Sequence, residues 1–193
     1  MSLPRLELKF EPIVKGNYIS VHPVTGWSRY KEWPINKWEE LITTIQEGSL
    51  IPVRFIQIGL ASDPKIKGCD HSYMNIPLLD SMALIANAQL HMGGDSFSNH
   101  LTHMTGTPAV ILWGSTQVSA SGYEQNANIS TGLPCQPCFK ESPYVSNMTN
   151  GPCANPPDQT YDNPKHKCMY DITVDMVYNK LQEVFSSQQA TVK

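Results

Sequence analysis

Residues 90–115 place the strongest restriction on the fold of this chain. They read LHMGGDSFSNHLTHMTGTPAVILWGS, in which a first apolar run leads into Gly93 and Gly94. An Asp-Ser pair then opens a stretch of helical character, and Gly106 ends that stretch before a second apolar run, 108–113. Strand, turn, helix and strand in this order are the repeating unit of α/β proteins with a parallel sheet.

The turn inside this unit is a candidate anion site. Gly93 and Gly94 let the backbone turn tightly and let a ligand approach closely. Asp95 or Ser96 can cap the following helix, and the N–H groups beyond the cap attract an anion such as phosphate. The same pattern is equally typical of an ordinary helix N-cap without a ligand. The local pattern therefore leaves both interpretations open.

The rest of the chain repeats the alternation of strand and helix. Short apolar runs predict strands over 18–22 and 52–58, with a further short strand around 73–76. Apolar residues three and four positions apart predict helices over 35–46, 77–88 and 172–185, the last capped by Thr173. The prediction is an α/β fold with a Rossmann-like parallel sheet and helices on both faces.

The domain organisation follows from where this pattern begins and ends. Residues 1–16, with their prolines, are expected to be a linker, and 17–187 a single domain. The polar, Pro-rich and Asn-rich segment 115–170 is predicted to lie outside the sheet, with 131–170 as an irregular cysteine-containing insertion. Residues 188–193 are predicted to be a disordered tail.

Composition excludes several classes of function. The 193 residues carry a net charge of -3 without a dense Lys/Arg cluster, which argues against nucleic-acid binding. The longest apolar run falls well short of the roughly 20 residues of a membrane span. The first residues do not resemble a signal peptide, so a cytoplasmic location is expected, with peripheral membrane association left open. Two glycosylation sequons, at Asn128 and Asn147, fit the alternative of a secreted protein.

A series of short motifs resembles the C-terminal half of the lipopolysaccharide heptosyltransferases, glycosyltransferase family 9, whose members have the GT-B fold. The resemblance covers about residues 17 to 185 and rests on the order and spacing of these motifs: His22-Pro23, Lys31-Glu32-Trp33-Pro34, Gly59, Asp95-Ser96, His100-Leu101, Gly106-Thr107-Pro108 and Trp113-Gly114.

The resemblance implies a domain that binds an ADP- or UDP-sugar donor for inverting transfer to a glycan or protein acceptor, without an organic cofactor. The implied binding residues are Thr25, Ser28 and Lys31 for the diphosphate, Gly59 with the backbone of 59–61 for the nucleoside, and Asp95, Ser96 and His100 for the sugar diphosphate. From the residues alone, a solvated surface lysine is the favoured interpretation of Lys31. Phe97 stands where the family usually has Gly, so its ring is expected to narrow the space for the pyrophosphate.

No catalytic residue is assigned to this chain. Family members take the carboxylate that acts as general base from an N-terminal half, and that half is expected to be the partner of these residues. Two rival functions remain open. One is half of a sugar-nucleotide 2-epimerase, although that class usually has Gln-Glu where this chain has His100-Leu101. The other is a non-catalytic GT-B-like interaction module held together by a metal.

Four of the five cysteines fall in the last third of the chain, at Cys135, Cys138, Cys153 and Cys168. Four thiolates at such spacings could bind a structural zinc or iron ion, and related heptosyltransferases carry a cysteine cluster here that in some members holds iron. Disulfides or reduced thiols are the alternatives. The remaining cysteine, Cys69, is expected to be a buried thiol.

Overall fold

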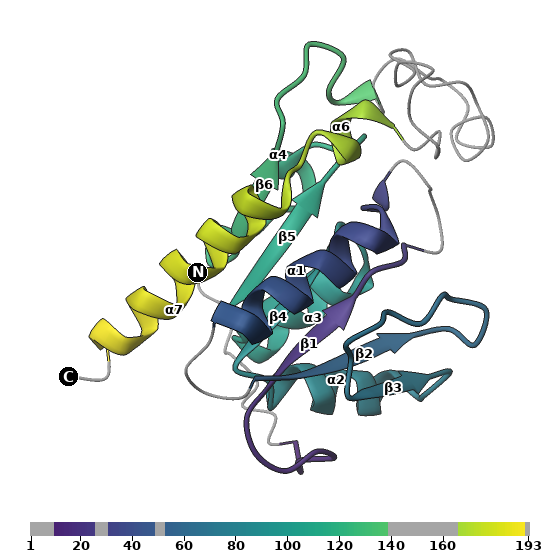
Figure 1. The fold of residues 1–193 in the computed structure, drawn as a ribbon, viewed down its shortest axis with the longest axis vertical. Coiled ribbons are helices and arrows are strands. Elements are labelled where there is room, and N and C mark those ends of the chain that lie inside the picture. The colour runs from purple at the N-terminus through teal and green to yellow at the C-terminus, as the bar shows by residue number, and fades with distance from the viewer. Residues whose placement is uncertain (1–9, 26–30, 49–52, 139–165, 192–193) are drawn as a thin grey trace, which may run out of the picture.

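The computed structural model describes residues 10–25, 31–48, 53–138 and 166–191, and strands and helices alternate along them (Figure 1). The strands are β1 (Tyr18–His22), β2 (Arg54–Gly59), β3 (His71–Met74), β4 (Leu90–Gly94), β5 (Ala109–Trp113) and β6 (Ala127–Ser130). The helices are α1 (Ile35–Gly48), α2 (Leu78–Ala86), α3 (Phe97–Thr105), α4 (Val118–Ser121), α6 (Lys167–Tyr170) and α7 (Val174–Thr191).

The six strands form one sheet in the order β3-β2-β1-β4-β5-β6, and every neighbouring pair is parallel. The chain builds outward from β1 to β3 and then crosses back to place β4 on the other side of β1. The predicted Rossmann-like parallel sheet is therefore confirmed. In such sheets a ligand crevice lies at the carboxyl ends of the strands where the order reverses, which here is between β1 and β4.

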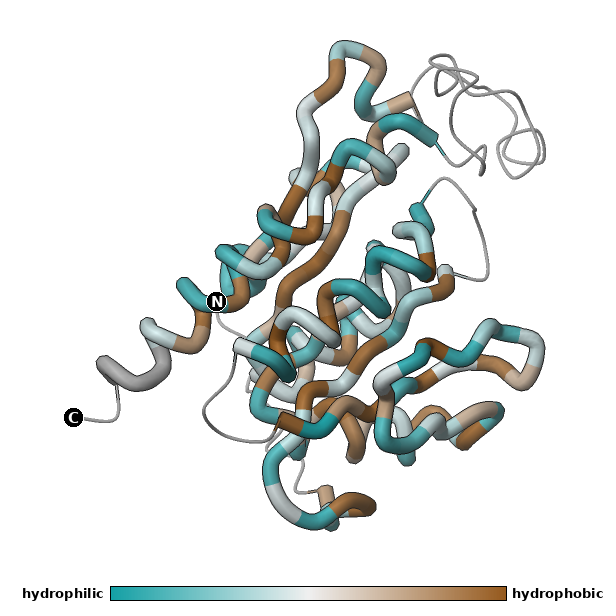
Figure 2. The backbone as a smooth tube through the Cα atoms, in the orientation of Figure 1, coloured by the Kyte–Doolittle hydropathy of each residue, from teal (hydrophilic) through white to brown (hydrophobic). Residues whose placement is uncertain are grey.

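Helices cover both faces of the sheet: α1 and α7 lie on the face toward the viewer in Figure 1, with α2 and α3 behind it. Alternate side chains of each strand supply the two layers. On β1, Ile19 and Val21 join the α1/α7 core, while Tyr18 joins the core under α2 and α3. Because both faces are buried, β5 is apolar along its whole length (Figure 2). The neighbouring strands β1 and β4 alternate apolar residues with the buried polar residues Ser20, His22 and His91.

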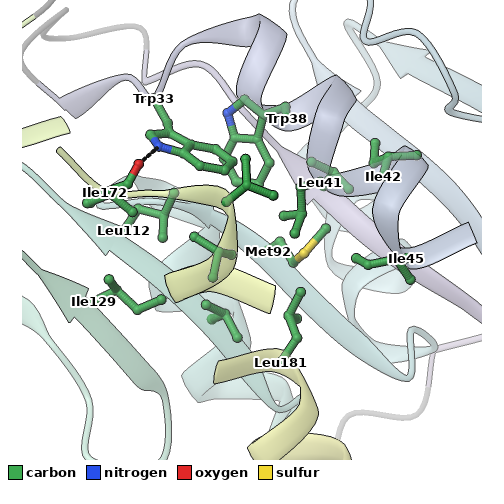
Figure 3. Packing of buried hydrophobic residues seen from close by; sticks show 14 of the residues in the cluster. Trp33, Trp38, Leu41, Ile42, Ile45, Met92, Leu112, Ile129, Ile172 and Leu181 are labelled. Carbon is green, nitrogen blue, oxygen red and sulfur yellow. Dashed lines mark hydrogen bonds between the residues drawn. The ribbon is translucent and has the colours of Figure 1, made fainter. Parts of the chain in front are cut away.

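The core between α1 and α7 is built around two tryptophans (Figure 3). The rings of Trp33 and Trp38 meet edge to face with centroids 4.9 Å apart, and both are buried. Trp33 Nε1 donates a hydrogen bond of 2.9 Å to the backbone oxygen of Ile172. The same oxygen accepts a bond of 3.0 Å from Lys37 Nζ. These bonds fix the segment that leads into α7 against the start of α1.

Two sequence predictions are wrong. The segment 115–170 does contribute to the sheet, because β6 pairs in parallel with β5 from Val110↔Ala127 to Trp113↔Ser130. As an edge strand, β6 buries only Ile129, so its four residues lack the apolar run that marks the other strands. The tail also differs, because α7 runs to Thr191 and residues 188–191 are helical.

The predicted cap of the last helix is confirmed: Thr173 Oγ1 accepts a hydrogen bond of 3.2 Å from the backbone N–H of Met176. In the part of the chain that the structure describes, no helix has the length and apolar character needed to cross a membrane.

Candidate functional site

A pocket of about 740 Å³ opens at the carboxyl edge of the sheet, where β1, β2, β4 and β5 end. Six of the residues implied by the family resemblance line it: Thr25, Lys31, Gly59, Asp95, Ser96 and His100. The seventh, Ser28, lies outside the described residues. Residues separated by up to 75 positions therefore meet at one place because parallel strands bring their carboxyl ends to the same edge.

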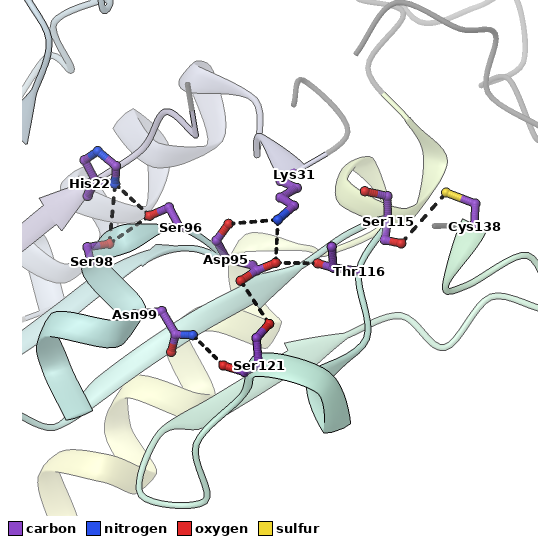
Figure 4. A network of polar contacts seen from close by, with 10 residues as sticks. All are labelled: His22, Lys31, Asp95, Ser96, Ser98, Asn99, Ser115, Thr116, Ser121 and Cys138. Atoms are coloured by element: carbon purple, nitrogen blue, oxygen red, sulfur yellow. Dashed lines mark hydrogen bonds and ion pairs between the residues drawn. The ribbon is translucent and has the colours of Figure 1, made fainter. Parts of the chain in front are cut away.

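A buried ion pair forms one wall of the pocket (Figure 4). Lys31 Nζ lies 2.7 Å from Asp95 Oδ2, and the two residues are only 8% and 5% exposed. Thr116 Oγ1 donates a 2.7 Å hydrogen bond to the same carboxylate oxygen, and Ser121 Oγ lies 3.5 Å from the other. Lys31 is thus not a solvated surface lysine. The pairing and the hydroxyl offset the cost of burying the two charges and fix both groups at the pocket wall.

The N-terminus of α3 is not capped as predicted. Ser96 occupies the N-cap position, but its side chain makes no capping hydrogen bond, and the carboxylate of Asp95 is engaged by Lys31 instead. Ser96 Oγ lies 3.0 Å from His22 Nδ1 and 3.0 Å from Ser98 Oγ. Competing partners across the sheet edge therefore draw both candidate caps away. The first turn of α3 begins at the pocket without a side-chain cap.

His22 ends β1 and lines the pocket, yet it is only 5% exposed. Its ring meets the ring of Phe97 edge to face, with centroids 4.7 Å apart. Burial lowers the pKa of His22 to about 4, against a smaller opposing effect of the Asp63 carboxylate. The imidazole is therefore neutral near pH 7.

A second buried histidine lies behind the first, on the same face of the sheet. His91 Nδ1 lies 2.9 Å from Ser20 Oγ, and Nε2 has no hydrogen-bond partner among the described residues. Burial, with a smaller contribution from the neighbouring His22, lowers the pKa of His91 to about 3. Gly93 leaves room for this ring, because a Cβ there would lie 3.0 Å from His91 Nε2.

Gly59 leaves space for the side chain of Asp63. A Cβ at this position would lie 2.6 Å from Asp63 Oδ2, which accepts a 2.7 Å hydrogen bond from the backbone N–H of Leu60. The backbone N–H of Ala61 likewise donates to Asn75 Oδ1 at 2.9 Å. Two of the backbone groups expected to contact a nucleoside are therefore bonded within the protein. Asp63 and Asn75 also line the pocket and present side-chain groups there.

His100 also lines the pocket, from an exposed position on α3. Its Nδ1 lies 2.8 Å from the hydroxyl of Tyr123, and the ring of His103 stacks on Tyr123 with centroids 4.0 Å apart. These contacts fix the orientation of His100 at the rim.

Phe97 is 41% exposed and lies at the pocket wall against His22. Its ring lines the pocket, which has a volume of about 740 Å³ with Phe97 in place. That volume is within the range of small-molecule sites.

Sequence reasoning assigned no role to several residues of this pocket. His22 is the last residue of a predicted strand, and Thr116 follows another predicted strand by three positions. The rule that ligand residues follow the carboxyl ends of parallel strands could have found both. Asn75 directly follows β3, so the same rule applies to it once the end of that strand is known. Asp63 reaches the pocket from a loop, and no local sequence pattern indicates its position.

The structure does not bring the predicted metal ligands together among the residues that it describes. Cys135 and Cys138 are half-buried, Cys168 is buried, and Cys153 lies outside the described ranges. Within those ranges no three Cys, His, Asp or Glu side chains form a group able to hold a metal, and no disulfide joins two of the cysteines. Cys69 is partly buried, and burial raises the pKa of its thiol to about 12, with a smaller contribution from Asp70.

Comparison with solved structures shows similar folds in several bacterial enzymes. One is the iron-containing dodecameric glycosyltransferase TibC from enterotoxigenic E. coli H10407, with a TM-score of 0.74 and 17% identity over 95% of this chain and 49% of that chain. Another is E. coli ADP-heptose lipopolysaccharide heptosyltransferase II, with a TM-score of 0.65 and 15% identity over 89% of this chain and 47% of that one. A third is E. coli heptosyltransferase WaaC with ADP-2-deoxy-2-fluoro heptose, with a TM-score of 0.58 and 15% identity over 89% of this chain and 44% of that chain.

This chain thus spans about half the length of these structural relatives. At such identities the likeness shows the fold. A search of curated protein sequences finds no match. The profile of glycosyltransferase family 9 (heptosyltransferase), in contrast, matches residues 2–148, most of the sequence. With that match and a parallel sheet shared with heptosyltransferases, the chain belongs to glycosyltransferase family 9, the heptosyltransferase family.

Proposed function

We propose that this chain is the donor-binding half of an inverting glycosyltransferase that uses a nucleoside diphosphate sugar. The observation that carries the proposal is the meeting of six family-implied residues around one pocket at the strand-order reversal. The structural relatives give the donor class: TibC is described in complex with ADP-D-β-D-heptose and WaaC with ADP.

The pocket supplies a consistent place for each part of such a donor. The uncapped first turn of α3 and the ammonium of Lys31 favour the negative charge of a diphosphate, with Thr25 as a further hydroxyl partner. Ser28, which lies outside the described residues, is proposed as a second hydroxyl partner from the family resemblance alone. The end of β2, with Asp63 and Asn75, would take the nucleoside. Asp95 and His100, with Ser96 of the cap position, would contact the sugar diphosphate.

The chemistry then divides between two halves. The acceptor hydroxyl attacks the anomeric carbon, a new C–O bond forms, and the bond to the diphosphate breaks with its electron pair passing to the nucleoside diphosphate. The positive end of α3 and the Lys31 ammonium would stabilise the charge that develops on the leaving group. An N-terminal half would remove the hydroxyl proton with a carboxylate and close the cleft. This chain binds and orients the donor and supplies no general base.

Titration calorimetry with ADP, UDP and an ADP-sugar tests donor binding, with Lys31→Ala and His100→Ala as site variants. Lys31→Ala should weaken ADP binding by at least tenfold, because a charge-assisted contact to phosphate is lost. His100→Ala should weaken binding of the ADP-sugar more than that of ADP. Met104→Ala is the matched control, since Met104 is exposed on the same helix and does not line the pocket. If the parent, the two site variants and the control all bind with equal affinity, the assignment is refuted.

The rival enzyme class is distinguished by its products. Incubation of the chain, together with an N-terminal GT-B half, with a nucleotide sugar would give glycosylated acceptor and free nucleoside diphosphate for a transferase. An epimerase would return a sugar nucleotide with inverted configuration at C2.

We further propose a structural iron or zinc ion held by Cys135, Cys138, Cys153 and Cys168. Support comes from their spacing and from the description of TibC as iron-containing. The three described cysteines do not form such a site by themselves, so the proposal requires the fourth. Metal analysis of the purified protein should give about one ion per chain, lost in Cys135→Ser and retained in Cys69→Ser. Absence of metal from the parent protein would exclude the site. It would also exclude the rival function, an interaction module held together by a metal.

A further inference from the structure

His22 is a pocket residue to which the proposed function gives no role. It lies at the end of the central strand β1, between the Gly59–Asp63 side of the pocket and the start of α3. Although the ring is almost wholly covered by protein, it still contributes to the pocket lining. The part of His22 that a ligand can reach is therefore small.

The Nδ1 side of the ring is occupied. Ser96 Oγ lies 3.0 Å and Ser98 Oγ 3.4 Å from Nδ1, and the two hydroxyls are 3.0 Å apart (Figure 4). If Ser98 donates to Ser96 and Ser96 donates to Nδ1, each hydroxyl proton has an acceptor. If Nδ1 carried the proton and donated to Ser96, Ser96 would donate to Ser98. The hydroxyl proton of Ser98 would then have no acceptor among the described contacts. Complete pairing therefore places the proton of the neutral ring on Nε2.

The Nε2 atom faces away from both serines (Figure 4) and has no hydrogen-bond partner in the described part of the chain. The ring plane is fixed from a second direction by Phe97, whose centroid is 4.7 Å from that of His22. Phe97, which departs from the family pattern, thus helps to orient a polar group at the pocket. Burial also keeps the ring neutral, since its pKa is about 4.

We propose that His22 is a ligand-contact residue whose Nε2–H donates a hydrogen bond to an oxygen of the bound nucleoside diphosphate, either a ribose hydroxyl or a phosphate oxygen. This inference rests on the proposed donor-binding function. Ser96 and Ser98 act as positioning residues, because they select the tautomer that presents N–H to the pocket.

Two isosteric variants separate the two ring nitrogens. In His22→Asn the amide oxygen can replace Nδ1 toward Ser96, but no N–H reaches the position of Nε2. In His22→Gln the longer amide can return an N–H near Nε2, while the contact at Nδ1 is lost. Calorimetric titration of this chain with ADP should show about tenfold weaker binding for Asn and a loss of less than about threefold for Gln. Adenosine and inorganic pyrophosphate identify the oxygen: a loss with adenosine indicates the ribose, and a loss with pyrophosphate indicates the phosphates.

Nitrogen-15 NMR of the His22 ring gives an independent measurement that needs no variant. The expected spectrum at pH 7 is that of the Nε2–H tautomer, with an Nε2 shift that moves when ADP is added. Affinity of the Asn variant equal to that of the parent, an equal loss in Gln and Asn, or an Nδ1–H tautomer would each overturn the inference. Failure of the parent chain to bind ADP at all would instead overturn the proposed function, so the two failures are distinguishable.

Discussion

The two buried histidines should make the folded state sensitive to mild acid. The pKa of His22 is about 4 and that of His91 about 3 in the folded protein, against 6.5 for an unhindered histidine. As the pH falls below 6.5 the unfolded chain takes up protons that the folded chain excludes, so folding stability decreases with decreasing pH. The stability is fully present above pH 6.5 and is lost progressively down to the folded pKa values.

The size of the loss at pH 5 depends little on the exact folded values. At 1.5 pH units below its ordinary pKa, each histidine stabilises the unfolded chain by about 2 kcal/mol, because one unit corresponds to about 1.4 kcal/mol. The folded state recovers almost none of this at pH 5, because both folded pKa values lie lower. Together the pair should remove about 4 kcal/mol between pH 7.5 and pH 5, a large share of the stability of a typical domain.

Urea unfolding at pH 7.5 and pH 5, followed by tryptophan fluorescence, measures this loss, since Trp33, Trp38 and Trp113 are all buried. His91→Asn should reduce the pH-dependent part of the unfolding free energy by about 2 kcal/mol, whatever it does to stability at pH 7.5. Met104→Ala is the control: it shortens an exposed side chain that does not titrate, and it should leave the pH dependence unchanged. If His91→Asn loses as much stability between the two pH values as the parent, the argument from burial is refuted.

Three further substitutions test the packing of the site and the core. Asp95→Asn removes the carboxylate partner of buried Lys31 and should lower the free energy of unfolding in urea by about 3–5 kcal/mol. Replacing Lys31 by Met as well should recover most of this loss. A small effect of Asp95→Asn alone would contradict the buried pair. Gly59→Ala should lower the free energy of unfolding by about 1–3 kcal/mol in the parent, because the new Cβ meets Asp63 Oδ2. The loss should be clearly smaller in an Asp63→Ala background. Additive effects of the two substitutions would exclude that clash. Leu181→Ala should lower the unfolding free energy by about 2–5 kcal/mol, and a cost below 1 kcal/mol would show that α7 packs loosely.

Much of the fold could be predicted because apolar side chains on the central strands report burial directly. The helix over 35–46 shows it well: Trp38, Leu41, Ile42 and Ile45 are spaced by three and four, and all four are buried against the sheet. The prediction failed for β6, whose residues Ala127–Ser130 are held by the β5 ladder and by a 2.8 Å bond from Trp113 Nε1 to Asn128 Oδ1. Pairing with a neighbour far along the chain leaves no periodic signal in a four-residue edge strand.

The site could be located from the sequence but not assembled. Position at the ends of strands placed Lys31 and Asp95 near each other, yet no local pattern indicates that their charges pair at 2.7 Å. The same holds for Ser96, which has the sequence of an N-cap and is drawn to His22 by a contact across 74 positions. Capping propensity describes what a serine does in an isolated helix. In the folded chain, Ser96 can either cap α3 or bond to His22, two hydrogen bonds of similar strength, and the tertiary contact decides between them.

The position of α7 has a consequence for how this chain reaches its fold during synthesis. The core on the α1 side of the sheet includes Ile172, Val177 and Leu181 from the last quarter of the sequence, packed with Trp33 and Trp38. All six strands precede these residues, so the sheet can pair before that face has its cover. A ribosome-bound chain ending before residue 166 would carry an exposed tryptophan-rich apolar surface, of the kind that chaperones bind. Completion of this half of the core therefore has to wait until α7 has emerged from the ribosome.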